Sequence, residues 1–226
     1  MIQNGVLLVN KPAGWTSHDV VAKLRGVLQI RKIGHAGTLD PMSTGVLVLL
    51  IGTATKQASQ YEADDKAYIA GLRLGYRSDT YDVTGEQTGV GATVTRAALE
   101  SALAGFRGDI MQVPPMYSAV KVQGKKLYEY ARKGREVERE PRRVVIKRLE
   151  LTETAPDSGQ DWNLLIECSK GTYVRSLCND IGDALGVGGV MSSLVRTRSG
   201  TFTLDECHTL EEIIENAKDG DCAWIL

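Results

Sequence analysis

The spacing of hydrophobic residues divides the chain into two kinds of segment, which predict strands and helices. Short apolar or alternating stretches predict strands at residues 5–10, 46–51, 66–74, 106–113, 143–151 and 162–168. Apolar residues that recur every three or four positions predict amphipathic helices at residues 17–28, 95–103, 173–185 and 210–217. Strands and helices follow one another along the chain, so we expect a mixed α/β (α+β) fold.

Local signals add detail to these elements. Thr16 or Ser17 can cap the first helix, because both side chains can accept a hydrogen bond from a free backbone N–H group. Residues 75–91 are rich in Gly and Asp and are expected to form a loop. Asp157-Ser158-Gly159 predicts the turn of a hairpin between the two strands that flank it. Residues 190–198 fit either a further strand or a segment at a helix edge.

The stretch from Gly34 to Gly45 has the composition of a shaped loop. It contains three glycines and a proline, which permit unusual backbone angles or fix one. It also holds Asp40, the only acidic residue between Asp19 and Glu62. Such a loop can hold a catalytic carboxylate in a fixed direction. The alternative is an Asx turn, in which Asp40 caps its own loop ahead of Pro41.

Composition excludes several classes of protein. The chain has 226 residues, of which 42% are hydrophobic, and it has no apolar run long enough to cross a membrane. The first residues lack a charged region followed by an apolar core, so we expect no signal peptide and a cytoplasmic location. The four cysteines form no Cys-x-x-Cys pair, and neither they nor the three histidines show metal-ligand spacing. We expect reduced thiols and no metal.

Positive charge is concentrated in one part of the chain. The net charge is -1, but residues 121–148 hold eleven Lys and Arg residues against four Glu residues, which leaves seven positive charges on that stretch. Such a patch can bind phosphates by releasing condensed counterions. The alternative is an ordinary solvated surface of mixed charge.

Five motifs, in this order along the chain, resemble those of one family. Residues Gly34-His35-Ala36-Gly37-Thr38-Leu39-Asp40-Pro41, followed by Thr44-Gly45-Val46-Leu47, resemble the active-site motif of the bacterial tRNA pseudouridine synthase B (TruB) family. The N-terminal, tyrosine, arginine and Leu-Arg-Arg-Thr motifs of that family are matched by residues 6–14, 65–68, 168–175 and 194–197, the last reading Leu-Val-Arg-Thr here. The motifs cover almost the whole chain, which is therefore identified as a member of this family.

The resemblance implies a fold and a reaction. The fold is that of the pseudouridine synthases, a central, largely antiparallel sheet flanked by helices. The reaction converts the T-loop uridine of tRNA, at the position written ψ55, into pseudouridine. It breaks the bond from ribose C1′ to N1 of the base and forms one to C5, with no metal or cofactor. Asp40 is the implied carboxylate, and whether it attacks the sugar or acts at C2′ to give a glycal stays open.

The same resemblance assigns further site residues. Arg175 pairs with the carboxylate, a task that suits the planar fork of a guanidinium. Tyr68 stacks on the target base, Tyr173 contacts the substrate, and Leu194 lines the uracil pocket. His35 fills the space left when the base is flipped out. Four of these residues also have a structural alternative. Arg175 could be a surface arginine, Tyr68 an ordinary strand aromatic, Leu194 a core leucine and His35 a structural histidine in a tight loop.

An inserted RNA-binding arm, about residues 109–143, is implied as well. In the family it closes over the T-arm stem-loop of tRNA, the expected partner. Tyr128 and Tyr130 alternate with cations there, which suits contact with bases and phosphates together. The alternative is a short helix over 127–133 whose tyrosines pack on the domain. The cations expected to contact the RNA backbone are Lys121, Lys125, Lys126, Arg132, Arg142 and Arg143.

Family members usually continue into a small C-terminal RNA-binding (PUA) domain, and nothing in these residues corresponds to it. We expect one catalytic domain over residues 1–226, acting as a monomer. Two other functions remain open. One is a synthase of the same fold that acts on ribosomal RNA, and the other is a tRNA-binding folding helper without catalysis.

Overall fold

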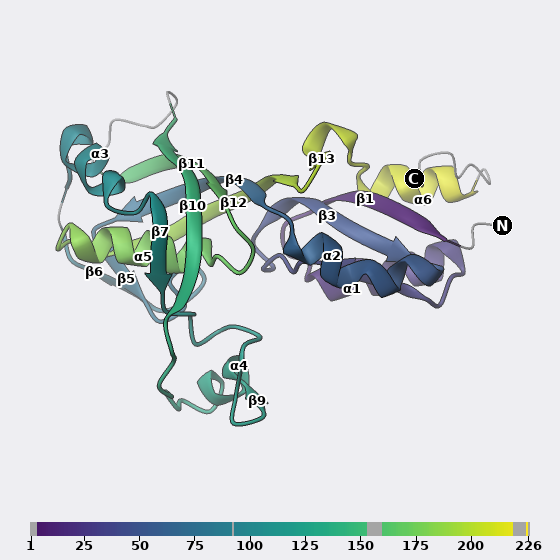
Figure 1. The fold of residues 1–226 in the computed structure, drawn as a ribbon, viewed down its shortest axis with the longest axis horizontal. Helices are drawn as coiled ribbons and strands as arrows, with labels where there is room; N and C mark the ends of the chain where they lie inside the picture. Colours follow the sequence, from purple (N-terminus) through teal and green to yellow (C-terminus); the bar gives the residue numbers. More distant parts are fainter. Residues whose placement is uncertain (1–3, 92, 153–159, 219–224, 226) are drawn as a thin grey trace. The chain divides into compact units, whose positions relative to one another are not determined.

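The computed structural model describes residues 4–91, 93–152, 160–218 and 225. The predicted turn at 157–159 lies outside these residues. The chain divides into two compact units, and Figure 1 labels their elements. Unit 1 consists of residues 1–68 and 194–226, and unit 2 consists of residues 69–193. Two strands, β4 (Lys66–Leu74) and β12 (Gly189–Ser199), have residues in both units.

Unit 1 confirms the elements predicted near both ends of the chain. Besides parts of β4 and β12, it contains β1 (Gly5–Lys11), α1 (Ser17–Leu28), β2 (Ile33–Ala36), β3 (Thr44–Ile51), η1 (Gly52–Gln57), α2 (Ala58–Ala63), β13 (Phe202–Thr203), η2 (Leu204–Glu206) and α6 (Leu210–Lys218). Thr16 caps α1 and forms a reciprocal capping box with Asp19, which fixes where the helix begins.

The strands of unit 1 pair in both directions. β1 is antiparallel to β3 along its whole length, from Gly5 opposite Ile51 to Lys11 opposite Gly45. β2 is antiparallel to the other edge of β3, and β13 is antiparallel to β12. β12 runs parallel to β3, with Arg196 opposite Gly45. The sheet is therefore mixed, with antiparallel pairs predominating among the pairings described here.

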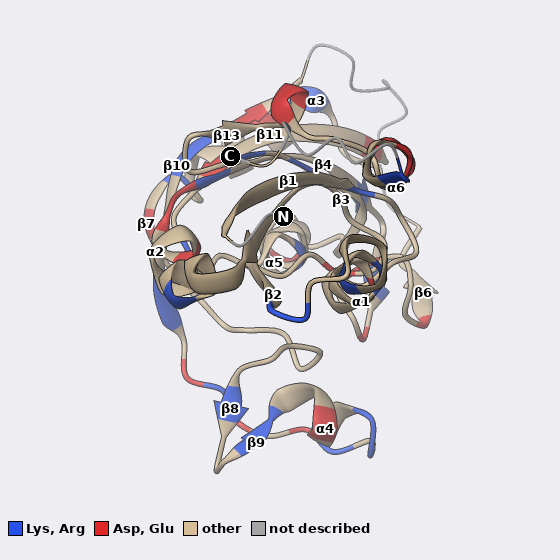
Figure 2. Cartoon of the chain, turned by 90° about the vertical axis from the view of Figure 1, so that its right-hand side faces the viewer, with Lys and Arg blue, Asp and Glu red and all other residues tan. Residues whose placement is uncertain are grey.

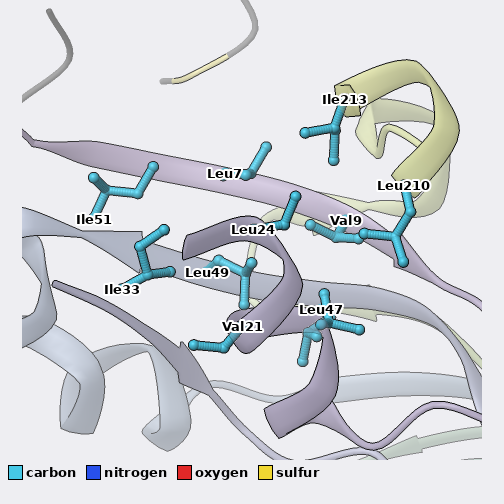
Figure 3. Close-up of a cluster of buried hydrophobic side chains, with 11 residues drawn as sticks. Leu7, Val9, Val21, Leu24, Ile33, Leu47, Leu49, Ile51, Leu210 and Ile213 are labelled. Carbon is cyan, nitrogen blue, oxygen red and sulfur yellow. The ribbon is translucent and has the colours of Figure 1, made fainter. Parts of the chain in front are cut away.

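The core of unit 1 explains why β1 and β3 are apolar without interruption. Side chains alternate between the two faces of a strand, and both faces are covered here. One face forms a cluster with α1 and α6, shown in Figure 3: Leu7, Val9, Val20, Val21, Leu24, Ile33, Leu47, Leu49, Ile51, Leu210 and Ile213. The intervening residues of the strands form a second cluster with Ala36: Val6, Leu8, Val46, Val48 and Leu50.

Unit 2 contains the remaining elements. They are β5 (Tyr76–Ser78), β6 (Gln87–Gly89), α3 (Arg96–Ala104), β7 (Gly108–Gln112), β8 (Lys121–Val122), β9 (Lys125–Lys126), α4 (Leu127–Ala131), β10 (Arg142–Leu151), β11 (Asp161–Cys168) and α5 (Val174–Ala184). The strand order is β12-β4-β11-β10-β7, and the predicted hairpin partners β10 and β11 are antiparallel.

Three predictions for this part of the chain need correction. β4 was expected to be half-buried, but Ile69 is its one exposed residue. The segment 75–91, expected to be a loop, contains the hairpin of β5 and β6. Residues 190–198 belong to a strand, β12, and not to a helix edge.

The segment between β7 and β10 forms a small substructure of its own. β8 and β9 pair as a hairpin, and α4 follows directly, so the short helix expected as an alternative at 127–133 is present over a shorter range. In Figure 1 these elements lie beyond the ends of β7 and β10. Within the described ranges, no helix is long and apolar enough to span a bilayer. Cys168, Cys178 and Cys207 are free thiols.

Candidate active site

Asp40 lies in a tight connection between β2 and β3. The backbone N–H of Ser43 donates to the carbonyl of Asp40 at 3.0 Å, which closes a reverse turn, and Asp40 is half-buried. The connection is tied to α1 by Ser17, whose hydroxyl accepts a hydrogen bond from the backbone N–H of Leu39 at 2.9 Å. The stretch expected to be a loop from Gly34 onward begins with strand β2, so the loop itself is shorter than predicted.

Lys11 supports this loop from the end of β1. Its side chain is fully buried, and Nζ donates to the carbonyl oxygens of Pro12 at 2.9 Å, Trp15 at 2.6 Å and Pro41 at 3.3 Å. Burial lowers the pKa of Lys11 to about 8, while the charge of Asp40 acts in the opposite direction. Lys11 is therefore still mostly protonated at neutral pH and places a positive charge in the field of the Asp40 carboxylate.

Arg196 supports the loop from β12. It is 2% exposed, and its guanidinium donates from Nε to the carbonyl of Val46 at 2.7 Å and from Nη2 to the carbonyl of Gly37 at 3.1 Å. The backbone of Arg196 packs directly against Gly45, which has a φ of +99°. Arg196 lies in the Leu-Val-Arg-Thr motif but was not among the predicted site residues, and its strand, β12, is too polar in sequence to mark it as buried.

Three predicted site residues lie in unit 1 with Asp40. His35 is on β2 opposite Leu49, not in a loop as its structural alternative assumed. Burial lowers its pKa, so the imidazole is neutral at neutral pH. Its Nδ1 is buried and makes no hydrogen bond within the described chain. Tyr68 and Leu194 are 9% and 7% exposed, which is compatible with a pocket wall or with plain core packing.

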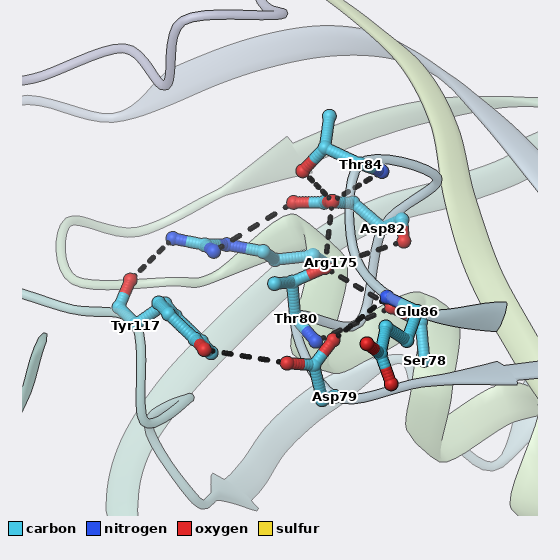
Figure 4. A network of polar contacts seen from close by, with 8 residues as sticks. All are labelled: Ser78, Asp79, Thr80, Asp82, Thr84, Glu86, Tyr117 and Arg175. Atoms are coloured by element: carbon cyan, nitrogen blue, oxygen red, sulfur yellow. Dashed lines mark hydrogen bonds and ion pairs between the residues drawn. The ribbon is translucent and has the colours of Figure 1, made fainter. Parts of the chain in front are cut away.

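Arg175 is the centre of a polar network in unit 2, shown in Figure 4. It is 7% exposed, so the alternative of a surface arginine is wrong. Its Nη1 lies 3.7 Å from Oδ2 of Asp82, and its Nη2 donates to the carbonyl of Tyr117 at 2.8 Å. Asp82 is itself buried, and its Oδ1 accepts hydrogen bonds from the Thr80 hydroxyl at 2.8 Å and the Thr84 N–H at 2.9 Å.

A second carboxylate extends this network. Asp79 accepts a hydrogen bond from the phenol of Tyr117 at 3.3 Å and another from the backbone N–H of Glu86 at 3.1 Å. Partial burial and the charge of Asp79 raise the pKa of Tyr117. Asp82 and Tyr117 were not among the predicted site residues. The run of Ser, Asp and Thr from Ser78 to Thr84 was a usable signal, because such side chains bond readily to one another and to a nearby arginine.

Tyr173 also lies in unit 2, where it is half-buried and occupies the N-cap position of α5. Its side chain makes no capping hydrogen bond. The arginine motif therefore places Tyr173 and Arg175 at the start of one helix. Asp40, His35, Tyr68 and Leu194 belong to unit 1.

The cations predicted to contact RNA lie on β8 and β9, at the C-cap of α4 and at the start of β10, and Figure 2 shows Lys and Arg in blue. Lys121, Lys125, Arg132, Arg142 and Arg143 are exposed, and Lys126 is half-buried. Lys126 Nζ and Arg132 Cζ lie 5.4 Å and 5.2 Å from the centre of the Tyr128 ring, within the range of cation–π attraction. Arg143 forms an exposed ion pair with Asp109 at 2.8 Å.

The described residues include no group of three or more His, Cys, Asp and Glu side chains that could hold a metal ion. Unit 1 offers a half-buried carboxylate, two buried cations and a tyrosine, and unit 2 offers a buried arginine with two carboxylates and two tyrosines. They are suited to charge stabilisation and to stacking on a base.

Comparison with known proteins identifies the chain's relatives. Residues 25–174 match the model of the TruB family pseudouridylate synthase N-terminal domain, and residues 175–222 match that of the tRNA pseudouridylate synthase B C-terminal domain. The tRNA pseudouridine synthase B of Bacillus licheniformis is 50% identical over 222 residues, which is 96% of this chain and 72% of that protein. The corresponding protein of Heliobacterium modesticaldum is 50% identical, over 93% of this chain and 70% of its own length.

Solved structures agree on the fold. The crystal structure of a Cbf5-Nop10-Gar1 complex contains a chain with a TM-score of 0.77 and 32% identity to this one. The similarity covers 98% of this chain and 58% of that chain, so this chain spans less than two thirds of its neighbour. The mixed sheet with flanking helices is thus the fold that the sequence motifs implied. On the family models and these relatives, the chain belongs to the TruB family of pseudouridylate synthases.

Proposed function

We propose that this protein converts a uridine in the T-loop of tRNA, at the position written ψ55, into pseudouridine. The observation that carries the proposal is the 50% identity, over nearly the whole chain, to proteins named tRNA pseudouridine synthase B. The Asp40 loop adds chemical support, since it presents a single half-buried carboxylate on a backbone held by two buried cations.

The proposed chemistry starts from the ionised carboxylate of Asp40. It either attacks C1′ of the ribose or removes a proton at C2′, and in both cases the bond from C1′ to N1 of uracil breaks. In the first path C5 of the turned base then displaces the carboxylate from C1′. In the second path C5 bonds to C1′ of the glycal while C2′ regains its proton from the acid. In both paths the proton on C5 then leaves as N1 gains one. The charge of Lys11 favours the ionised form of this carboxylate. Arg175 is proposed to pair with it during the reaction, the role that the family resemblance implies.

The remaining site residues hold the base. Tyr68 stacks on it, Leu194 supplies the apolar wall of the pocket, and Tyr173 contacts the substrate. His35 occupies the space that the flipped nucleotide leaves in its loop. A neutral imidazole suits that role, because inserting a charged group between stacked bases would cost more desolvation than inserting a neutral one.

The arm, about residues 109–143, is proposed to grip the T-arm stem-loop. Its exposed cations can pair with phosphates, and Lys126 and Arg132 lie beside the ring of Tyr128, where a base could also be contacted. All of the proposed groups lie on one chain, so a monomer is sufficient. A tRNA substrate would place the reaction in the cytoplasm.

The decisive experiment maps pseudouridine in an unmodified tRNA transcript treated with wild type or Asp40→Asn. We expect modification confined to the T-loop uridine and absent with Asp40→Asn, whose affinity for tRNA stays within a few-fold of wild type. Modification of other positions or other RNAs would contradict the substrate. A wild type that binds and refolds tRNA without forming pseudouridine would favour the folding helper.

A further inference from the structure

The first strand of the arm is fastened to the helix that carries Arg175. Gln112 is the last residue of β7 and is 2% exposed. Its Nε2 donates to the carbonyl of Tyr173 at 3.1 Å, and its Oε1 accepts from the backbone N–H of Tyr173 at 2.8 Å. One buried carboxamide therefore binds both polar backbone groups of the residue at the N-cap of α5. The side chain of Tyr173 makes no cap of its own, so Gln112 supplies an external support for this end of the helix.

Two more hydrogen bonds join the same segments. The hydroxyl of Ser176 donates to the carbonyl of Val113 at 3.1 Å, and Nη2 of Arg175 donates to the carbonyl of Tyr117 at 2.8 Å (Figure 4 shows the second). We call residues 112–117 the arm root. Three of the first residues of the α5 region, at positions 173, 175 and 176, are thus each bonded to the arm root.

The arm root is built to be stiff. Pro114 and Pro115 lie in the middle of it and are both buried, and a proline ring removes freedom at φ. A displacement of the root by the arm therefore acts on the α5 residues through hydrogen bonds, and is not absorbed by a flexible linker.

We propose that Gln112 is a positioning residue, which holds the backbone of Tyr173 and thereby links the arm to the placement of Tyr173 and Arg175. The inference rests on the proposed function, in which Tyr173 contacts the substrate and Arg175 pairs with the ionised carboxylate of Asp40. Gln112 itself contacts no substrate. When the arm binds RNA, the arm root and the start of α5 become ordered together. RNA binding is therefore coupled to the placement of Tyr173 and Arg175.

The test compares Gln112→Met with wild type in single-turnover pseudouridine formation and in tRNA binding. Met keeps the length of the side chain and removes both hydrogen bonds. We expect the single-turnover rate to fall by about tenfold or more, because misplacing reacting groups by small distances is costly, while the dissociation constant for tRNA changes less than about threefold. Gln60→Met, which makes the same substitution on the exposed face of α2, is the matched control.

Further variants separate positioning from general damage. Gln112→Glu keeps the acceptor for the Tyr173 N–H but sets a buried carboxylate against the Tyr173 carbonyl, so it should recover part of the rate only at acidic pH, where the protonated acid can donate. In an Arg175→Lys background, Gln112→Met should cost much less than in wild type, since a residue that acts through another shows non-additive effects. Additive losses, or a rate unchanged in Gln112→Met with folding intact, would overturn the proposal.

A measurement that does not depend on activity keeps the two proposals distinct. Amide hydrogen exchange at residues 174–178 should slow when wild type binds a T-arm stem-loop and should not slow in Gln112→Met. If wild type forms no pseudouridine, the proposed function fails, and the exchange data still decide whether the arm and α5 are linked. Equal slowing in both proteins would show that they are not linked through Gln112.

Discussion

The Asp40 loop and the arm both depend on cations, but they use them in opposite ways. Around the loop, Lys11 and Arg196 are buried and bond to backbone carbonyls of Pro41, Gly37 and Val46. In the arm, the cations are mostly exposed, and two of them lie over one tyrosine ring. A buried cation bonded to backbone oxygens fixes the path of the chain, whereas an exposed one remains available to a phosphate.

The comparison shows where rigidity and adaptability are needed. The loop is tied to β1, α1 and β12, and the carboxylate proposed to react would need such a fixed position, within a fraction of an ångström. A surface that grips an RNA backbone gains from side chains that can move to meet it. The arm root, where Gln112 holds Tyr173, shares the rigid character of the loop.

A Gly→Ala substitution in the Asp40 loop should lower the stability of the protein far more than one in the arm. Gly45 and Gly134 both have positive φ, +99° and +63°. A Cβ at Gly45 would also collide with the carbonyl oxygen of Arg196, whereas Gly134, in the arm, has open space around it. We expect Gly45→Ala to lower the free energy of unfolding by more than about 3 kcal/mol and Gly134→Ala by about 1 kcal/mol, measured by urea denaturation. Equal losses would mean that the packing against Arg196 is not tight.

Arginine substitutions sharpen the same contrast. Arg196→Met leaves the carbonyls of Gly37 and Val46 without their buried donor, so we expect a loss of about 2–3 kcal/mol in unfolding free energy. Arg132→Met, on the exposed side of Tyr128, should change stability by less than about 0.5 kcal/mol while weakening tRNA binding. A stable Arg196→Met protein with reduced tRNA affinity would reverse the assignment of these two cations.

Local signals were enough to predict much of the fold. The start of α1 follows from Thr16, which can cap a helix, and β4 has the bounds that its apolar pattern predicted. β2 was missed because four residues rich in Gly and Ala carry little strand preference by themselves. Its pairing with β3 stabilises it, and that partner lies beyond the loop.

The site was less predictable, because its contacts join distant parts of the chain. The motif indicated Asp40 but not the two cations that hold its loop. Arg196 bonds to Val46, 150 positions away in the sequence, and Lys11 bonds to Pro41, 30 positions away. Gln112 and Tyr173 are 61 positions apart. No period or local composition encodes such pairs, since they follow from tertiary packing.

Salt dependence should measure how many arm cations meet phosphates. Replacing Lys125, Lys126 and Arg132 together with Ala should lower tRNA affinity about tenfold at moderate salt. It should also reduce the slope of log K against log salt concentration by roughly 0.7 to 0.9 per lost phosphate contact. Glu129→Gln in α4 is a control that removes a charge of the opposite sign and should not reduce the slope. An unchanged slope in the triple variant would mean that these cations serve the arm's own structure.

The smallest effect concerns Lys11 and the pH dependence of stability. Its pKa in the folded protein is about 8, below the ordinary value of 10.5, because burial disfavours the charged form. Between those two values the unfolded chain binds more protons at this residue than the folded chain does, so raising the pH favours the folded state. From pH 7.5 to 8.5 we expect wild type to gain less than about 1 kcal/mol in unfolding free energy relative to Lys11→Met.

Tyrosine and cysteine titrations are common to both proteins and cancel in the difference. The neutral amine still donates to carbonyl oxygens, so the loop should keep its shape as this proton leaves. A stability difference from Lys11→Met that stays constant over this range would show that Asp40 offsets burial, because a lysine held as an ion pair would stay protonated in both the folded and the unfolded chain.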